Sequence, residues 1–212
     1  MPGLFVTFEG GEGSGKSTQV TRLAERLARA GSEPVVVREP GGTPLAESIR
    51  ALLLDPGRTL DPTTEALLMV AARSDLVAAK LRPALAQGRV VLCDRYTDST
   101  LAYQGGGRGL DGAMLAWWNR AATGGLVPDL TLLFDLSPEL GLARRKATHG
   151  TANRLDLETP AFHTRVRGRY LELARAEPQR FVVLDASLPA DALAERVWSA
   201  VAARLPAASS RG

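Results

Sequence analysis

A glycine-rich segment near the first residue of the chain has the composition and spacing of a phosphate-binding loop. Gly10 and Gly15 are followed directly by Lys16 and Ser17, which satisfies the pattern Gly-x4-Gly-Lys-Ser. Glycines let successive backbone N–H groups point at one anion, and the N-terminus of a following helix adds positive charge. We expect Lys16 to reach the β- and γ-phosphates of a nucleoside triphosphate, which we take to be ATP, and the Ser17 hydroxyl to bind Mg²⁺. The residues expected around ATP in this loop are Gly10, Gly11, Glu12, Gly13, Ser14, Gly15, Lys16, Ser17 and Thr18.

Lysine is rare in this chain, which makes the lysine at position 16 notable. Of the 26 lysines and arginines in the chain, only Lys16, Lys80 and Lys146 are lysines. A compact ammonium fits a slot that a planar guanidinium does not, so a retained lysine is consistent with a site built for that group. Chance alone also allows a lysine here, and the spacing of the loop therefore carries the prediction.

An acid and an arginine, Asp94 and Arg95, directly follow a short apolar run that ends at Cys93. If that run is a strand of a parallel sheet, the pair lies beside the ligand crevice at the carboxyl ends of the strands. The acid can then serve the magnesium shell, and the arginine can bind a second anionic group such as an acceptor phosphate. The alternative interpretation is a salt-bridged pair on the surface.

A second basic cluster lies between Gly141 and Arg154. It contains Arg144, Arg145 and Lys146 and no acid, and small and polar residues interrupt its helical pattern. Phosphoryl transfer needs charge neutralisation in the transition state, and a mobile loop that closes over the donor can bring arginines to it. A solvated basic loop is the competing interpretation, and we favour the functional one.

Apolar periodicity predicts the elements that must position these residues. The predicted strands are Leu4–Phe8, Pro34–Val37, Val90–Cys93, Leu130–Phe134 and Phe181–Leu184. The predicted helices are Lys16–Ala30, Leu45–Leu54, one that follows an N-cap at Asp61 and reaches about Ala79 with a disturbance near Pro83, Gly112–Ala122, Pro160–Arg175 and Ala190–Arg204. Apolar strands that alternate with helices indicate an α/β domain with a mostly parallel sheet.

Length, charge and cysteine content limit the class of protein. A chain of 212 residues suits a single domain, which we place at residues 1–205, with a mobile lid at about 141–158 and a flexible tail at 206–212. A net charge of only +3 argues against a nucleic-acid-binding surface, and no apolar run is long enough to cross a membrane. No targeting segment is recognised at the first residues, and a single cysteine, Cys93, fits a reducing cytoplasm. We therefore expect a cytoplasmic protein without nucleic-acid or membrane partners.

The phosphate loop alone is compatible with several classes of protein. The sequence has no Asn-Lys-x-Asp motif for reading guanine, which argues against a GTPase. The leading hypothesis is a kinase that phosphorylates a small molecule, and the rival from another class is a nucleotide-dependent binding or switch protein that hydrolyses ATP slowly. Arg95, Arg73 and Arg50 favour the kinase because they suggest an acceptor site that a switch does not need.

Several segments, in order along the chain, resemble those of one enzyme family. Leu92–Gln104 (LCDRYTDSTLAYQ) closely resembles the signature of thymidylate kinases, and Glu39–Thr43 (EPGGT) is similar to a second characteristic segment of that family. The other matching segments are Phe8–Gly10, Ala71–Arg73, Tyr103–Gly109 and Arg169–Ala174. The resemblance runs from about Leu4 to about Leu205 and so covers nearly the whole chain.

The resemblance implies both a fold and a reaction. The implied fold is the three-layer α/β fold of P-loop nucleoside-monophosphate kinases, with a central parallel sheet flanked by helices and a mobile lid. The implied reaction is ATP + dTMP → ADP + dTDP with Mg²⁺, carried out by a homodimer whose small-molecule partners are ATP and dTMP. A kinase for UMP, CMP or a deoxynucleoside is the rival among enzymes, and Tyr103 within the signature segment favours thymidylate.

The resemblance also implies roles for the acceptor-site residues. Arg73 would bind the thymine edge, Arg95 would bind the dTMP phosphate, and Asp94 would hold the metal or orient that phosphate. Tyr103 would stand where a ribose 2′-hydroxyl would lie and so favour deoxyribose. Met69 stands where the family usually has a phenylalanine that stacks on thymine. The remaining residues expected near dTMP are Glu39, Pro40, Arg50, Ser99, Thr100 and Gln104, with Thr100 and Gln104 lining the base or the sugar.

The family places an assisting basic residue either in the phosphate loop or in the lid. The variable loop residues here are not basic and the predicted lid is, so the chain resembles the lid-arginine kind. Arg145 or Arg154 would assist transfer, and Arg144 would lie nearer the adenine. Asn153 replaces the aspartate that often precedes the lid arginine. Outside these segments, we interpret His149 as a lid surface residue, His163 as a structural residue of a helix, and Trp117 and Trp118 as core or subunit-contact residues.

Overall fold

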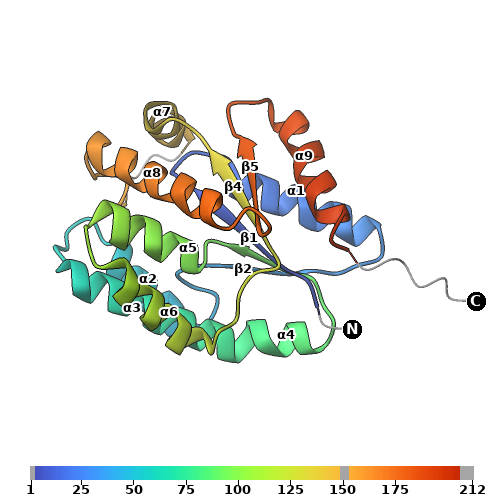
Figure 1. Cartoon of the computed structure of the whole chain (residues 1–212), viewed down its shortest axis with the longest axis horizontal. Helices are drawn as coiled ribbons and strands as arrows, with labels where there is room; N and C mark the ends of the chain where they lie inside the picture. Colours follow the sequence, from blue (N-terminus) through green and yellow to red (C-terminus); the bar gives the residue numbers. More distant parts are fainter. Residues whose placement is uncertain (1–2, 149–152, 206–212) are drawn as a thin grey trace, which may run out of the picture.

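A five-stranded sheet organises the part of the chain that the structure describes (Figure 1). The structure, a computed structural model, describes residues 3–148 and 153–205. Neighbouring strands are parallel and follow the order β2-β3-β1-β4-β5. The strands are β1 (Phe5–Gly10), β2 (Val35–Arg38), β3 (Val91–Asp94), β4 (Leu130–Asp135) and β5 (Phe181–Asp185). Each predicted strand is confirmed, and the predicted mostly parallel sheet is wholly parallel in these residues.

Helices cover both faces of the sheet and complete three layers, as predicted (Figure 1). Helices α1 and α9 lie against one face, and α3, α4 and α8 lie against the other. The α-helices are α1 (Lys16–Arg29), α2 (Pro44–Leu54), α3 (Pro62–Leu76), α4 (Arg82–Ala86), α5 (Thr97–Thr100), α6 (Gly112–Thr123), α7 (Pro138–Thr148), α8 (Pro160–Ala176) and α9 (Ala190–Ala202). Two π-helical segments are η1 (Val77–Leu81) and η2 (Leu101–Gly107). None of the helices within the described ranges is long and apolar enough to span a membrane.

The helix predicted from Asp61 to about Ala79 corresponds to α3, which ends at Leu76 and is followed directly by η1 and α4. Asp61 caps α3 by accepting from the N–H groups of Thr63 and Thr64, as its sequence position predicts. The sequence also predicted a disturbance near Pro83, and the structure has one just before that proline. The disturbance is η1, which precedes the proline, and the chain then continues as α4 with Pro83 in its first turn. Proline has no N–H and crowds the preceding turn, so a wider π-helical turn before it lets the rod continue.

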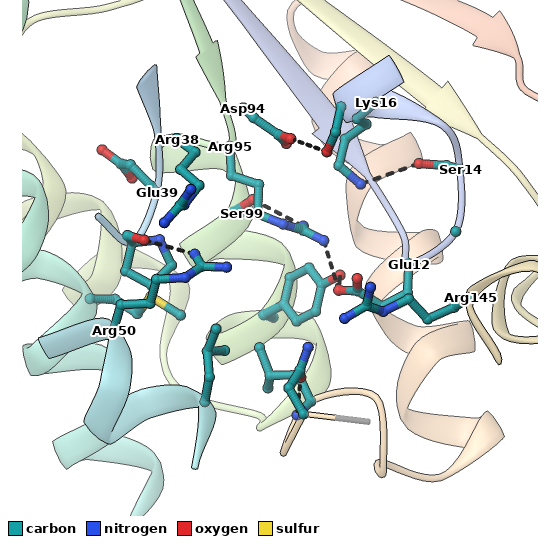
Figure 2. Close-up of a pocket in the computed structure, with 18 of the residues that line it drawn as sticks. Glu12, Ser14, Lys16, Arg38, Glu39, Arg50, Asp94, Arg95, Ser99 and Arg145 are labelled. Carbon is teal, nitrogen blue, oxygen red and sulfur yellow. Dashed lines mark hydrogen bonds and ion pairs between the residues drawn. The ribbon is translucent and has the colours of Figure 1, made fainter. Parts of the chain in front are cut away.

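The carboxyl ends of β1 and β3 place the two candidate motifs side by side (Figure 2). Phe8 pairs with Asp94 at the end of the β1–β3 ladder, so the phosphate loop and the Asp94–Arg95 pair leave the sheet together. Gly15 takes the left-handed conformation (φ 85°) directly before α1. Arg95 also has a positive φ, of 73°, which is unique among the non-glycine residues that the structure describes. Strain of this kind concentrates at functional sites.

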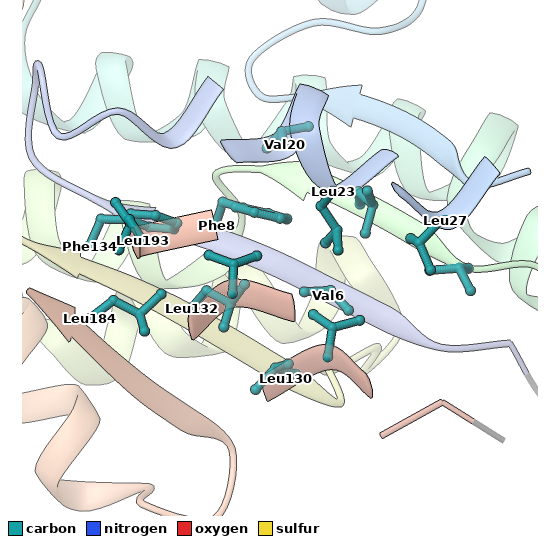
Figure 3. Close-up of a cluster of buried hydrophobic side chains, with 14 of the residues drawn as sticks. Val6, Phe8, Val20, Leu23, Leu27, Leu130, Leu132, Phe134, Leu184 and Leu193 are labelled. Carbon is teal, nitrogen blue, oxygen red and sulfur yellow. The ribbon is translucent and has the colours of Figure 1, made fainter. Parts of the chain in front are cut away.

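The core beneath these loops follows the alternation of the strands (Figure 3). Val6 and Phe8 of β1 point toward α1, where they meet Leu23 and Leu27. Phe5 points to the opposite face and packs against the ring of Tyr96 at a centroid distance of 5.0 Å. Fully burying a side chain of this kind contributes about 1.5–3 kcal/mol. The strand ends that carry the site are therefore held by packed side chains on both faces.

The basic segment from Gly141 to Arg154 differs from the sequence prediction. We expected it to interrupt a helix, whereas Gly141–Thr148 continues α7. A Cβ on Gly141 would lie only 2.3 Å from the carbonyl oxygen of Glu12, so the small residue serves close packing of α7 against the phosphate loop. Residues 149–152, including His149, and the predicted tail at 206–212 lie outside the described residues.

Candidate active site

A cavity of about 800 Å³ lies at the carboxyl ends of β1, β2 and β3 (Figure 2). It brings together the phosphate loop, the residues after β2 and β3, and the basic side of α7. The predicted site residues that line it are Glu12, Gly13, Ser14, Gly15, Lys16, Ser17, Thr18, Glu39, Pro40, Arg50, Met69, Arg73, Asp94, Arg95, Ser99, Thr100, Tyr103, Gln104, Arg144 and Arg145. Gly10, Gly11 and Arg154 were also predicted and are not part of this lining. Arg38, Leu54, Ala147, Asn153 and Leu155 line the cavity without having been predicted to.

The ammonium of Lys16 is held inside the phosphate loop. Its Nζ donates to the carbonyl oxygens of Gly10 and Gly11 at 3.0 and 2.7 Å and to Ser14 Oγ at 3.2 Å. The side chain is only 7% exposed. Burial, followed by the nearby positive charge of Arg95, lowers the pKa of Lys16 to about 8. An anion bound in the loop would counteract both effects and raise the pKa of Lys16 again.

Arg95 lies across the loop from Lys16 and contacts its glutamate. Its Nη2 donates to Glu12 Oε1 at 2.7 Å, and its Nη1 donates to the Gly10 carbonyl at 3.1 Å. The guanidinium also lies 4.9 Å from the centre of the Tyr103 ring, whose hydroxyl donates to Glu12 at 2.8 Å. Burial works against ionisation of Glu12, but Arg95 and then Lys16 outweigh it and lower its pKa to about 2. Glu12 is therefore ionised, and its negative charge lies near both Arg95 and Lys16.

Asp94 and Ser17 form a pair of oxygen groups beside Lys16. Ser17 Oγ donates to Asp94 Oδ2 at 2.7 Å (Figure 2). A carboxylate and a hydroxyl are hard oxygen ligands of the kind that Mg²⁺ prefers, and Mg²⁺ is usually held by one or two carboxylates together with substrate phosphates. No group of three or more His, Cys, Asp or Glu side chains suited to a metal ion is found among the described residues. The hydroxyl of Ser17 and the carboxylate of Asp94 fit a magnesium ion that a phosphate ligand shares.

Arg73 is buried at the inner end of the cavity, where four hydrogen bonds and an ion pair hold its guanidinium. It pairs with Glu39 Oε2, at 2.8 Å from Nε and 2.6 Å from Nη2. It also donates to Thr100 Oγ1 at 2.9 Å, Asn119 Oδ1 at 2.6 Å and the Tyr96 carbonyl at 2.9 Å. Burial alone would lower the pKa of Arg73, and the Glu39 carboxylate outweighs it and raises that pKa. Arg73 thus lines the cavity and holds Glu39 and Thr100 in place.

Further arginines stand at the end of the cavity beyond β2. Arg50 donates to the Pro40 carbonyl at 2.8 Å, and burial together with the neighbouring Arg38 lowers its pKa. Arg38 forms an exposed pair with Glu47 at 3.0 Å. Sequence analysis missed Arg38, although its place as the last residue of a parallel strand could have identified it.

A buried carboxylate that sequence analysis also missed, Glu9, supports the turn that carries Arg95. It is the residue before the phosphate loop, and it accepts from the Tyr96 N–H at 2.7 Å, Ser99 Oγ at 2.6 Å and Tyr170 Oη at 2.8 Å. Burial, followed by the charge of Asp98, raises the pKa of Glu9 to about 7. The carboxylate ties β1 to the backbone directly after Arg95 and to α8.

The three arginines predicted in the lid have different surroundings. Arg144 donates to the Ala186 carbonyl at 2.8 Å, and Arg145 donates to both oxygens of Asp156 at 3.1 and 3.2 Å. Arg154 is 9% exposed and pairs with Glu65 of α3 at 2.7 Å. In this conformation Arg145 lines the cavity, whereas Arg154 lies outside the lining and is held by its ion pair with Glu65. The sequence did not predict this pair because the two residues are far apart in it.

The comparisons with known proteins agree on one family. The family model for thymidylate kinase matches residues 8–197. The chain belongs to the thymidylate kinase family. It is 56% identical over 197 residues to the thymidylate kinase of Thermomicrobium roseum, with 93% of each chain covered. It is 53% identical over 202 residues to that of Deinococcus radiodurans, covering 95% of this chain and 98% of the relative.

A solved structure gives the same result for the fold. The crystal structure of thymidylate kinase from Ehrlichia chaffeensis matches with a TM-score of 0.77 and 32% sequence identity, covering 95% of this chain and 99% of that chain. Both the P-loop monophosphate-kinase fold and the resemblance seen in the sequence are thus confirmed. As a member of this family, the chain is a nucleotide-binding phosphotransferase that converts dTMP to dTDP in an ATP-dependent reaction.

Proposed function

We propose that the chain transfers the γ-phosphoryl group of Mg-ATP to dTMP with Lys16 on the donor side and Arg95 on the acceptor side. One observation carries the proposal: both cations donate to the same carbonyl oxygen, that of Gly10, at 3.0 and 3.1 Å. Two cations this close favour anions near them, and a donor and an acceptor phosphate supply such charge. Transfer then needs alignment and charge neutralisation more than covalent help from the protein.

The donor half is assigned to the phosphate loop and α7. The backbone of the predicted loop residues cradles the phosphates, with Lys16 at the β- and γ-phosphates. Ser17 and Asp94 would hold Mg²⁺, which when bound neutralises charge on the phosphates. A second cavity of about 330 Å³, which Thr18 and Arg144 both line, adjoins the loop and would take the adenosine part of ATP.

The acceptor half is assigned to the residues after β2 and β3. Arg95 and Arg50 would bind the dTMP phosphate. Arg73 would bind the thymine edge, Thr100 and Gln104 would line the base or the sugar, and Met69 would cover the ring face. The remaining acceptor-site residues are Glu39, Pro40, Ser99 and Tyr103, the last excluding a ribose 2′-hydroxyl.

The lid is proposed at residues 141–158 of a single domain that covers residues 1–205. Among the lid arginines we assign the assisting role to Arg145, because it lines the cavity and its positive charge reaches Glu12. Movement of the lid would open the site for exchange and close it against water during transfer.

The proposed assembly is a homodimer with α3 and α6 in the contact. These helices pack on each other and expose large apolar side chains, Leu67 at 47% and Trp117 at 67%. Exposed apolar patches of this kind mark protein interfaces. A second copy of the chain is the partner that the family resemblance implies.

A cytoplasmic location is part of the proposal. Cys93 is a free thiol, buried in the described structure, and the chain has no other cysteine with which to form an internal disulfide. Fractionation of cells that produce the chain would test the location.

The function is tested by measuring ADP release from Mg-ATP with dTMP, dUMP, UMP, dCMP and AMP in parallel. We expect strong preference for dTMP and ADP release that depends on added monophosphate. Comparable turnover of UMP or AMP would contradict the acceptor site. ADP release that ignores dTMP would contradict the whole assignment.

A further inference from the structure

A buried glutamate outside the cavity lining contacts one of the side chains that line the cavity, that of Gln104. Glu65 of α3 is 0% exposed. It accepts from Gln104 Nε2 at 2.7 Å and from Arg108 Nη2 at 3.0 Å, and it forms an ion pair with Arg154 Nη1 at 2.7 Å. Two arginines and one amide thus converge on a single carboxylate.

The charge of Glu65 determines which way the amide of Gln104 points. Burial acts against ionisation of Glu65, but hydrogen bonds from Arg108 and Gln104 outweigh it and lower its pKa. An ionised carboxylate only accepts hydrogen bonds, so the NH₂ of Gln104 must face Glu65. Gln104 Oε1 is left on the other side, where it receives no hydrogen bond from the described residues. Because Gln104 lines the cavity, this places an acceptor on the cavity wall.

A second wall group, one helical turn earlier, has the opposite polarity. Thr100 Oγ1 accepts from Arg73 Nη1 at 2.9 Å. Its hydroxyl hydrogen is therefore directed elsewhere, and no acceptor for it is found in the described part of the chain. Thr100 is also part of the cavity lining. The wall thus offers a donor at Thr100 and an acceptor at Gln104.

This polarity suits one class of pyrimidine. Thymine presents an N3–H donor next to a carbonyl acceptor, whereas cytosine presents an N3 acceptor next to an amino donor. A site built to hydrogen-bond one pattern rejects the inverted one because its own buried polar groups are left unpaired. The wall is complementary to thymine and opposed to cytosine.

We propose that Glu65 is a positioning residue that sets base specificity by holding the Gln104 amide with its oxygen toward the acceptor nucleotide. This inference rests on the proposed function, which places the base beside Gln104. Glu65 acts without touching the substrate, through the amide that it orients.

The Glu65→Gln substitution should turn the Gln104 amide over, so that its NH₂ instead of its oxygen faces the cavity. In E65Q, Arg108 and Arg154 would keep the side-chain oxygen at this position, so the new NH₂ would face Gln104. The Gln104 amide would then turn its oxygen to that NH₂ and its own NH₂ to the cavity. We expect the ratio of kcat/KM for dTMP to that for dCMP to fall about tenfold or more. An unchanged ratio in folded E65Q would overturn the inference.

Two further variants separate the causes of such a fall. Glu158→Gln is the matched control, because Glu158 pairs with Arg108 at 2.6 Å in the same network without a hydrogen bond to Gln104. E158Q should keep the ratio of the unmodified chain, and an equal fall in both variants would overturn the role of Glu65. Gln104→Met should lower the ratio, and E65Q added to Q104M should lower it no further. If Q104M keeps the ratio, the proposed placement of the base is wrong; if Q104M lowers it and E65Q does not, only the Glu65 inference fails.

A measurement on the unmodified chain keeps the inference testable if E65Q does not fold. The side-chain NH₂ signals of Gln104, assigned by their loss in Q104M, should exchange slowly with D₂O without nucleotide, because they donate to a buried carboxylate. Exchange at the rate of an exposed glutamine would overturn the inference.

Discussion

Lys16 and Arg95 are two cations that the protein holds close together. Each donates to the Gly10 carbonyl, and Glu12 and Asp94 supply negative charge nearby. Burial and Arg95 still lower the pKa of Lys16 to about 8. The site is therefore sensitive to pH before ATP binds, since binding of the donor phosphates requires the charged ammonium.

From this pKa follows a pH dependence of the donor step. Lys16 is charged below about pH 8 and loses its proton above it. We expect kcat/KM for ATP to fall as pH rises through about 8, by roughly tenfold per unit, because kcat/KM reports groups of the free enzyme. Steady-state rates between about pH 6.5 and about pH 9.5 at saturating dTMP would show this. A flat profile across that range would contradict it.

Glu9 leads to a prediction about stability. Its pKa is about 7 in the folded chain against 4.5 for an ordinary glutamate, so between these values the folded chain keeps a proton that the unfolded chain releases. The free energy of unfolding should therefore fall as pH rises from about 4.5 to about 7, by up to about 3 kcal/mol from this group. Urea unfolding across this range should show a smaller fall for Glu9→Gln. Parallel curves for the two proteins would speak against the shift.

At the scale of elements, α7 is seated on the phosphate loop through glycines on both sides. A Cβ on Gly13 would lie 2.0 Å from the Gly141 carbonyl, and one on Gly141 would lie 2.3 Å from that of Glu12. The backbone of α7 therefore packs directly against the backbone of the phosphate loop. This contact determines the position of α7, which carries Arg144 and Arg145.

The Gly141→Ala substitution tests this contact. The added methyl group cannot fit without a shift of α7 or of the loop, so we expect kcat to fall by about tenfold or more through displaced arginines. Gly168→Ala in α8 is the matched control, since a Cβ there meets nothing within 4 Å. G168A should keep its activity and gain roughly 0.5–1 kcal/mol of stability from the helix. Equal activity in both variants would show that α7 is not held by this contact.

Much of the site was readable from the sequence because its motifs are local. The phosphate loop and the Asp94–Arg95 pair each combine a spacing with a strand end, and parallel strands bring their carboxyl ends to one edge. The pairing of Arg154 with Glu65 was not readable, because residues far apart in the sequence are brought together only by the fold. The pairing of Arg145 with Asp156 was also not predicted, although Asp156 lies just beyond the last arginine of the basic cluster, because the sequence does not show which arginine the acid contacts.

Helix geometry was predicted less well than helix existence. Periodicity located α3, but η1 and η2 were not expected, because a π-helical turn changes the residue count per turn without changing composition. The consequence matters at η2, which carries Tyr103 and Gln104. Both side chains line the cavity because of this π-helical turn, which the residue pattern did not predict.

At the scale of the whole molecule, the exposed face of α3 and α6 carries the assembly prediction. We expect the chain to be a dimer by light scattering and Trp117→Glu to shift it to a monomer, because a charge would replace the largest exposed side chain of that face. Val183→Glu, at a 50% exposed position of β5 outside that face, is the control and should remain a dimer. A W117E protein that stays dimeric would place the contact elsewhere.

The scarcity of lysine gives this molecule a built-in chemical reporter. Lys80 and Lys146 are exposed, whereas Lys16 lies inside the phosphate loop with its pKa lowered to about 8. At a pH of about 8 an amine-directed reagent small enough to enter the cavity should acylate Lys16 with a rate advantage, since about half of it is the free amine. ATP should suppress that one modification and leave the other two unchanged. Mass spectrometry of the lysine-containing peptides could then follow occupancy of the donor site without any label introduced by mutation.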